Sequence, residues 1–405
     1  MNIRTPKTAR LVSVTTRRLK KEFIELYYRV YARYPANRDN FDHAAANFLY
    51  QKDSFSRGCQ IEPVLVSAGG QFVARAILLR HPCLDALQIA CFEALPGQGR
   101  AVDLILERAS RLAGEWGVDT VIVGMNGHLT YGLGFLKDRQ DLPAAFSGAY
   151  TPEYYPEYFS GRGFAEHALT TYYADTALFD PSRKLLNHAY SGISYRVIRL
   201  NDLKREMEIL GSLFNKTLAG TRFYFHKDIR ESYEMIREIR PLLKNENIIC
   251  AMKDGREIGF VLWHPNFNEI IPDNRRINLH VFFLRCKLFG GSIKEFMINT
   301  IGVLPEYENR GVSLGLINEV VRRVNGVYRG GETCFVWDDN IKSSLFCRAL
   351  CREALRHYVV YEWRPGGDRT GSVGPGREWA AKDNTSRHGN TPGPETHADA
   401  RLRLV

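Results

Sequence analysis

The stretch Met297-Ile-Asn-Thr-Ile-Gly-Val-Leu-Pro-Glu-Tyr-Glu-Asn-Arg-Gly-Val-Ser-Leu-Gly-Leu316 holds the most informative pattern in this 405-residue chain. Residues 297–303 are rich in apolar and β-branched side chains, which predicts a strand, and Pro305 ends it. Beyond Gly311 apolar residues recur at helical spacing, so a helix is expected. Such a junction offers free backbone N–H groups and a positive helix end to an anion, and glycine permits close approach. The segment predicts either a phosphate cradle or a plain strand-to-helix turn.

The same segment resembles the acyl-CoA signature of GNAT acetyltransferases, V-x-P-x-Y-[QR]-x-x-G-[VI]-[GA]. The matching residues are Val303, Pro305, Tyr307, Gly311 and Val312. Two positions depart from the signature: Glu308 replaces Gln or Arg, and Ser313 replaces Gly or Ala. An acid near the pyrophosphate weakens the electrostatics, although such a loop contributes mainly main-chain donors. The resemblance implies an acyl-CoA site at Ile301, Val303, Glu308, Asn309, Arg310, Gly311, Val312, Ser313 and Asn340.

A second match follows downstream. The sequence Trp337-Asp-Asp-Asn340 closes a strand expected at 333–337, and a helix is expected at 341–350, followed by a strand at 356–362. This resembles the later GNAT motif, in which an Asn contacts the pantetheine arm. Asn340 and Ser343 fit its N-x-x-[AS] part. Cys347 stands where the family usually has a catalytic Tyr, so that general acid is missing.

The first half of the chain carries weaker signals. A helix is expected near 101–116, strands at 63–67 and 72–78, and an amphipathic helix over 19–31. Together with the Gly124-Met-Asn-Gly127 segment, these elements resemble the first domain of bacterial proteins with two tandem GNAT-like domains. The acyl-CoA signature is absent from this half: residues 92–100 are Gly-rich but lack its V-x-P-x-Y lead. We expect a degenerate domain that shapes the acceptor cleft.

The expected fold is therefore α/β (α+β), with two tandem GNAT-like domains, each a mixed, largely antiparallel sheet flanked by helices. We place an N-terminal domain at 10–175, a linker at 176–194 and the acyltransferase domain at 195–364. In that second domain, helices are expected at 202–217 and 229–240. Strands at 248–252 and 258–264 flank Asp254-Gly255, a strong hairpin turn signal. Residues 365–405 hold few large apolar side chains and are expected to be a disordered tail.

Composition narrows the setting. The formal net charge is +10, which favours anionic partners in general. The first 21 residues hold seven Lys or Arg and no acid, and we interpret them as the basic entry to the first helix rather than as a targeting peptide. Eight dispersed cysteines without a C-x-x-C pair indicate reduced thiols, no metal and a cytoplasmic protein. The apolar runs are too short to cross a bilayer, so no membrane partner is expected.

The GNAT resemblance implies direct acyl transfer, with an oxyanion donor among the backbone N–H groups of 301–303 and a base for the amine. Tyr358 and Asp339 are the candidate catalytic residues. Other candidate bases near predicted strand ends are Glu306, Asp338, His264 and His280. Cys347 is interpreted as a buried core residue rather than as a nucleophile, since no His is expected beside it.

The leading hypothesis is an N-acyltransferase that moves an acetyl or longer acyl group from acetyl-CoA or another acyl-CoA to a primary amine of a small molecule or amino acid. An acyl carrier protein is a further candidate partner. One alternative is an aminoacyl-tRNA-dependent transferase, which the basic pI of about 9.1 would suit, although such an enzyme has no need of an acyl-CoA cradle and we expect no nucleic acid. The other is a non-catalytic acyl-CoA-binding or scaffold protein.

Overall fold

The computed structural model of this protein describes residues 9–38, 43–178, 192–273, 276–351 and 353–365. The expected tail at 365–405 lies outside the described residues except for Pro365, and so does most of the linker at 176–194. In the described part of the chain, no helix is both long and apolar enough to cross a bilayer.

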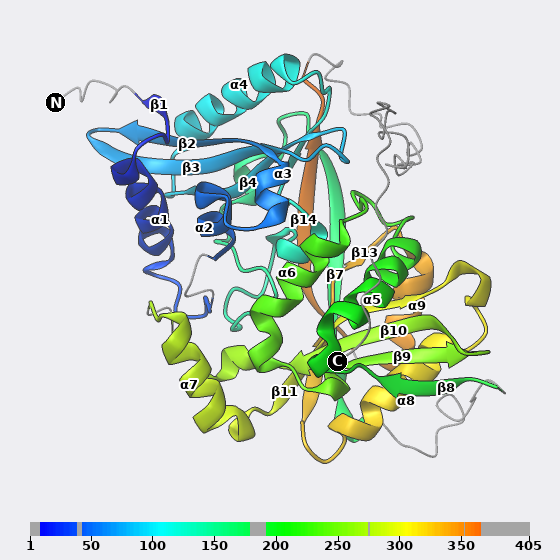
Figure 1. Cartoon of the computed structure of the whole chain (residues 1–405). Coiled ribbons are helices and arrows are strands. Elements are labelled where there is room, and N and C mark those ends of the chain that lie inside the picture. The colour runs from blue at the N-terminus through cyan, green and yellow to red at the C-terminus, as the bar shows by residue number, and fades with distance from the viewer. Residues whose placement is uncertain (1–8, 39–42, 179–191, 274–275, 352, 366–405) are drawn as a thin grey trace, which may run out of the picture.

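One mixed sheet of 14 strands runs through the molecule (Figure 1). Its main path has the order β1-β2-β3-β4-β5-β14-β7-β12-β11-β10-β9-β8, with β6 and β13 paired to β14 and β7. The strands are β1 (Arg10–Ser13), β2 (Gln60–Ala68), β3 (Gln71–Arg80), β4 (Leu87–Ala94), β5 (Val121–Val123), β6 (Phe135–Leu136), β7 (Ala165–Asp175), β8 (Ser194–Val197), β9 (Ile248–Lys253), β10 (Arg256–Pro265), β11 (Glu295–Val303), β12 (Gly330–Thr333), β13 (Val336–Trp337) and β14 (Glu353–Trp363).

Helices cover both faces of this sheet. They are α1 (Arg17–Tyr31), α2 (His43–Tyr50), α3 (Ser54–Gly58), α4 (Gly99–Glu115), α5 (Leu203–Thr217), α6 (Ile229–Ile239), α7 (Leu279–Phe289), α8 (Val312–Val324) and α9 (Ile341–Leu350). In the first half α1 packs on β3 and β4, and α4 packs on β1 to β4. All eight residues of β4 are buried, as expected for a strand covered from both sides. In the second half α5 and α8 cover β10 and β11.

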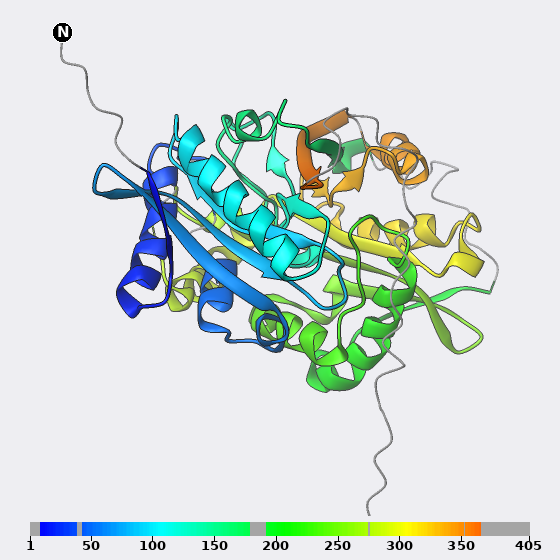
Figure 2. The same ribbon diagram turned by 90° about the horizontal axis from the view of Figure 1, so that it is seen from above.

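The two halves have the same order of strands, and the final strand of each half pairs with strands of the other half. The first half contributes β1 to β5 and the second β8 to β12, and in each half only the last two of these strands, β4–β5 and β11–β12, are parallel. Strand β7, the long final strand of the first half, pairs with β12 of the second. Strand β14, at the end of the second half, pairs with β5 of the first. Between them β7 and β14 form a long antiparallel seam, so the halves lie side by side in one sheet (Figure 2).

Most predicted elements are present. The amphipathic helix near the N-terminus is α1, whose buried residues include Phe23, Leu26 and Tyr31. The hairpin turn has Asp254 and Gly255 at φ of 49° and 75°, the positive values that a two-residue turn between twisted strands requires.

Two expectations near the second half need correction. The strand expected at 333–337 is interrupted after Thr333, because β12 pairs with β11 and β7 whereas β13 pairs with β7 alone. His280 does not lie near a strand end. It lies in the first turn of α7, which begins after Asn278, whose side chain accepts a hydrogen bond from the backbone N–H of Val281.

Candidate active site

The parallel strands β11 and β12 separate halfway along their length. Glu295 to Ile298 pair with Gly330 to Thr333, and no pairing follows on that side. Strand β11 remains paired with β10 as far as Val303. The segment that follows β12 instead continues as β13, which pairs with β7. The result is an opening in the sheet whose two walls are β11 and β13.

A cavity of about 250 Å³ lies in this opening and draws on both halves of the chain. From the second half, its lining includes Thr300 and Ile301 of β11, Trp337 of β13, and Asn340, Ser343 and Cys347 at and within α9. From the first half it includes His128, Thr130, Ser147 and Gly148, and Tyr358 of the exchanged strand β14 closes the same space.

The backbone of β11 offers hydrogen-bond donors to this opening. Leu304 donates its N–H to Ile258 O in β10 at 2.9 Å. Because successive residues of a strand point their N–H groups to opposite sides, the N–H groups of Val303 and Ile301 point away from β10, toward the opening. These are the groups among which the oxyanion donor is expected.

The loop before α8 has the conformation of an anion cradle. Asn309 and Gly311 are left-handed, with φ of 58° and 76°. No side chain caps the first turn of α8, since its N-cap is Gly311. The backbone N–H groups of that turn, at Val312 and Ser313, therefore remain available to a ligand.

The acid in the cradle is compensated electrostatically. Glu308 lies 3.4 Å from Nζ of Lys342, in the first turn of α9. This ion pair joins the cradle to the helix whose Asn340 and Ser343 line the cavity, so the two sites are neighbours. The guanidinium of Arg310 lies over the ring of Tyr307, 5.8 Å from its centre. Glu308, Asn309 and Arg310 are exposed to solvent.

Asn340 has two structural roles, because it caps helix α9 and also lines the cavity. Its Oδ1 atom accepts a hydrogen bond from the backbone N–H of Ser343 at 3.1 Å, and this fixes the start of α9. The amide therefore has an orientation set by the helix and not by a ligand.

Tyr358 lines the cavity, and Asp339 does not. The Tyr358 side chain is buried, its hydroxyl donates weakly to Ala149 O at 3.4 Å, and burial raises its pKa well above the usual value. Tyr358 therefore holds its proton at neutral pH. Asp339 has a side chain 61% exposed and forms an ion pair with Arg222. Its predicted catalytic role stays a prediction.

The other candidate bases lie outside the cavity lining. Glu306 is exposed, as is His280, and Asp338 accepts a hydrogen bond from the hydroxyl of Thr170 at 2.7 Å. His264 is buried in β10, and burial lowers its pKa to about 4.

Cys347 also lines the cavity, as a protonated thiol. Burial, followed by the neighbouring sulfurs of Cys334 and Cys351, raises the pKa of this thiol well above its usual value. Because the thiolate is the nucleophile, this environment favours a packing role, as predicted from the sequence. Within the described residues, no group of three or more His, Cys, Asp or Glu side chains is arranged to hold a metal ion.

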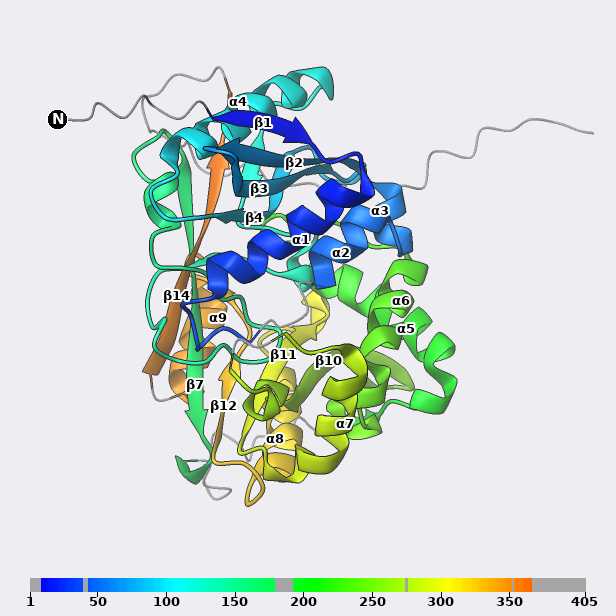
Figure 3. The same ribbon diagram turned by 90° about the vertical axis from the view of Figure 1, so that its left-hand side faces the viewer.

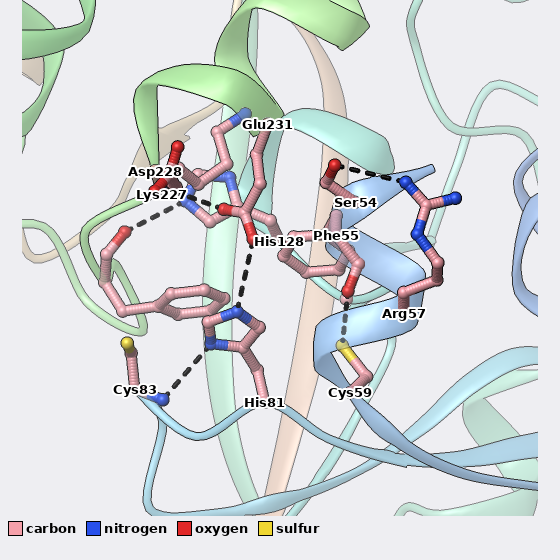
Figure 4. Close-up of polar contacts among 12 residues, drawn as sticks. Ser54, Phe55, Arg57, Cys59, His81, Cys83, His128, Lys227, Asp228 and Glu231 are labelled. Atoms are coloured by element: carbon pink, nitrogen blue, oxygen red, sulfur yellow. Dashed lines mark hydrogen bonds and ion pairs between the residues drawn. The ribbon is translucent and has the colours of Figure 1, made fainter. Parts of the chain in front are cut away.

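Sequence reasoning missed a polar chain at the wall that the first half contributes to the cavity, and Figure 4 labels two of its members, His128 and Lys227. Nε2 of His128 lies 3.2 Å from Phe225 O. A carbonyl only accepts, so Nε2 carries the hydrogen and Nδ1 is free to accept. The Thr130 hydroxyl lies 3.0 Å from this Nδ1 and donates to it. Nζ of Lys227 in turn donates to Thr130 Oγ1 at 3.0 Å.

Lys227 is the titratable end of this chain. It is buried, and burial lowers its pKa to about 8, with the charge of Glu231 opposing the shift. Its other neighbours are Sδ of Met235 at 3.4 Å and the ring of Tyr131, whose centre lies 5.3 Å away. Burial and the charge of Lys227 hold the pKa of His128 well below its ordinary value. Of the two nitrogens beside Thr130, Lys227 therefore binds a proton more firmly.

Glu231 links Lys227 to a further histidine. A carboxylate oxygen of Glu231 lies 3.8 Å from Nε2 of His81, and the backbone N–H of Cys83 donates to Nδ1 of His81 at 3.2 Å (Figure 4). No spacing in the sequence could indicate this cluster, because its members lie just after β3, in the loop after β5, and just before and within α6. The position of His128, directly after Gly124–Gly127, was its one available signal.

Known structures share this fold. A tandem GNAT protein from the clavulanic acid biosynthesis pathway aligns with a TM-score of 0.52 and 13% identity, over 89% of this chain and 100% of that one. A GCN5-related glucosamine N-acetyltransferase region of a fungal multi-domain GH3 β-N-acetylglucosaminidase aligns with a TM-score of 0.53 and 15% identity over 89% of this chain, which spans 38% of that one. No family model and no curated protein matches the sequence. At these identities the likeness establishes the fold, and the expected fold class is confirmed.

Proposed function

We propose that this protein transfers an acyl group from acyl-CoA to a primary amine of a small molecule or amino acid, in the cavity between β11 and β13. One observation carries the proposal. The sheet opens into a cavity lined by His128 and Thr130 of a buried polar chain, and the Glu308–Lys342 ion pair joins this region to an uncapped helix start with the left-handed residues Asn309 and Gly311. A plain strand-to-helix turn has no need of this combination. The GNAT-like fold supports the same reading by analogy.

The donor side fits a phosphorylated thioester. The N–H groups at the start of α8 suit the pyrophosphate, and Asn340 suits the amide-rich arm. Bound acyl-CoA would supply an activated carbonyl carbon. The N–H of Ile301 or Val303 would then stabilise negative charge on the carbonyl oxygen.

The acceptor side fits an amine, because such a substrate arrives protonated and must lose a proton before it attacks. An ammonium bound at Thr130 would give one proton to Oγ1. At the same time the Thr130 hydroxyl, turned from Nδ1 of His128 toward uncharged Nζ of Lys227, would pass its own proton to Nζ. The amine becomes neutral and Lys227 becomes an ammonium, so charge and protons balance. A group with a pKa near the working pH is suited to this role, and that of Lys227 is about 8.

Tyr358 is the proposed proton donor to the departing thiolate, since it lines the cavity and keeps its proton at neutral pH. The second proton that the attacking nitrogen loses as the amide forms would restore the Tyr358 hydroxyl. The first half of the chain would then act mainly on the acceptor, through His128 and Thr130.

Thermal-shift measurements with CoA, acetyl-CoA and long-chain acyl-CoA test the donor, because a ligand that binds only the folded state raises the melting temperature. Mass spectrometry of a panel of amines incubated with acetyl-CoA tests transfer. A shift without any acylated product would indicate a non-catalytic acyl-CoA-binding protein. No shift, together with salt-sensitive binding of aminoacyl-tRNA, would indicate the RNA-dependent alternative.

A further inference from the structure

Helix α7 exposes large apolar side chains, although it lies on the surface. Its inner face packs through Phe282, Phe283 and Cys286 against a small cluster around Phe267 and Ile293. Its remaining apolar side chains are exposed by between 41% and 63%, and they are Leu279, Val281, Leu284, Leu288 and Phe289. These five are half of the ten large hydrophobic side chains exposed in the described residues. A surface helix normally carries polar residues outward, so α7 has the composition of a covered helix.

The charge within α7 and its immediate flanks in the chain is positive. Residues 276–294 contain Arg276, Arg285, Lys287 and Lys294 and no acid. Lys287 and Lys294 are exposed. Exposed apolar side chains flanked by Lys and Arg can both insert into the headgroup region of an anionic membrane and attract its lipids.

Helix α1, which carries several basic side chains and the acids Glu22 and Glu25, contacts the segment before α7. Arg276, just before α7, pairs with Glu25 of α1 at 2.8 Å and lies over the ring of Tyr28. Both helices lie on the side of the molecule that faces the viewer in Figure 3. The exposed basic residues of α1 and its C-terminal flank are Arg17, Arg18, Lys21, Arg29 and Arg33. Arg17, Arg18 and Lys21, which the proposed function leaves unused, thus belong to this surface.

A second copy of the chain fits this surface poorly. The surface that α7 and α1 form together carries more exposed basic than acidic side chains. A symmetric contact would therefore bring two basic surfaces together. A lipid surface needs no shape complementarity and supplies the missing anions.

We propose that α7 and the basic face of α1 form a docking surface for an anionic lipid bilayer. The absence of a membrane partner was expected from the lack of a spanning run, but a helix lying in the interface needs no such run. The proposal does not depend on the transferase activity proposed above.

Co-sedimentation with vesicles tests it. The full chain should bind vesicles of phosphatidylcholine mixed with phosphatidylglycerol, bind pure phosphatidylcholine weakly, and release as salt is raised. Leu284→Glu combined with Leu288→Glu should weaken binding at least about tenfold. The same loss is expected for Lys287→Glu with Lys294→Glu, whose positions do not enter the fold's core.

Val327→Glu is the matched control, since Val327 is 58% exposed and lies outside both helices. It should bind the vesicles as the wild type does, and equal melting temperatures would show that all variants fold. Equal binding of wild type and Leu284→Glu/Leu288→Glu overturns the proposal. So does a wild-type dimer in light scattering that becomes a monomer in that variant, because α7 would then be a contact between copies.

Discussion

Nζ of Lys227 lies 3.0 Å from Oγ1 of Thr130, although 97 positions separate the two residues in the chain. Thr130 comes from the half that lacks the acyl-CoA signature, and Lys227 comes from the half that carries it. The proposed path for the acceptor's proton therefore crosses between the halves, and neither half contains it alone.

Lys227→Met should remove the proton acceptor. In the wild type the rate of acyl transfer should rise with pH through about 8, because only the uncharged amine accepts a proton. The variant should no longer show this rise in rate with pH, and its kcat should be about 10²–10⁴-fold lower than that of the wild type. Steady-state rates across pH measure both effects.

Lys216→Met, an exposed lysine on α5, is the matched control and should keep the wild-type profile. The acyl-CoA thermal shift should survive in both variants, since neither lysine contacts the cradle. A Lys227→Met enzyme with an unchanged limb near pH 8 would show that another group accepts the proton.

Gly311→Val should abolish acyl-CoA binding. A β-branched residue resists the φ of 76°, so the loop must rearrange and its N–H groups turn away from the pyrophosphate. Gly326→Val places the same strain at a φ of 75°, at an open turn with no atom within 4 Å of the added Cβ. Both variants should lose about 1–3 kcal/mol of unfolding free energy. Only Gly311→Val should lose the rise in melting temperature that acyl-CoA causes. An equal rise in both variants would show that acyl-CoA binds elsewhere.

Asn340 can be separated into its two roles by substitution. Asn340→Ala removes the cap on α9 and should cost about 1 kcal/mol of stability, whereas Asn340→Asp keeps a capping oxygen. If the amide also contacts the pantetheine arm, both variants should raise KM for acyl-CoA. Normal KM in Asn340→Asp would limit the residue to its structural role.

Tyr358→Phe tests the proposed acid. The variant should lower kcat about 10²-fold or more and leave acyl-CoA affinity nearly unchanged, because the ring still fills the wall of the cavity. Tyr361→Phe is the control on the same strand. The Tyr361 hydroxyl contacts Ser160 and does not line the cavity, so the kcat of this variant should stay near the wild-type value. Equal activity of the two variants would remove Tyr358 from the mechanism.

His264 should make the protein sensitive to acid. Its folded pKa of about 4 lies below the ordinary 6.5, so the unfolded chain binds the extra proton first as pH falls. This contribution to stability is present above pH 6.5 and is lost toward pH 4, by about 3 kcal/mol in total. His264→Phe, whose ring can pack between Phe146 and Phe267, should lack this loss. Urea unfolding at both pH values measures it, and parallel losses in the two proteins would contradict it.

The sequence predicted what is encoded locally. The turn at Asp254-Gly255 needs two residues that tolerate positive φ, and the loop into α8 needs Gly311, so both could be read from neighbouring residues. The exchange of β7 and β14 could not be predicted from the sequence. The backbone edge of a strand can pair with any other strand, and no residue pattern in 353–363 indicates pairing with β5. Helix α7 was missed since its apolar residues show no period. Lys227 was missed because its role comes from burial against Thr130.

The exchanged strand has a consequence for synthesis of the chain. Val121 pairs with Trp363, so the gap between β5 and β7 stays open on the ribosome until nearly all of the described chain has been translated. The first half cannot complete its sheet as it emerges, which departs from the usual N-terminal-first order of cotranslational folding. A nascent chain stalled before residue 353 would expose two unpaired strand edges, a hazard that chaperones would have to cover. The sheet is therefore complete only when its last strand has been made.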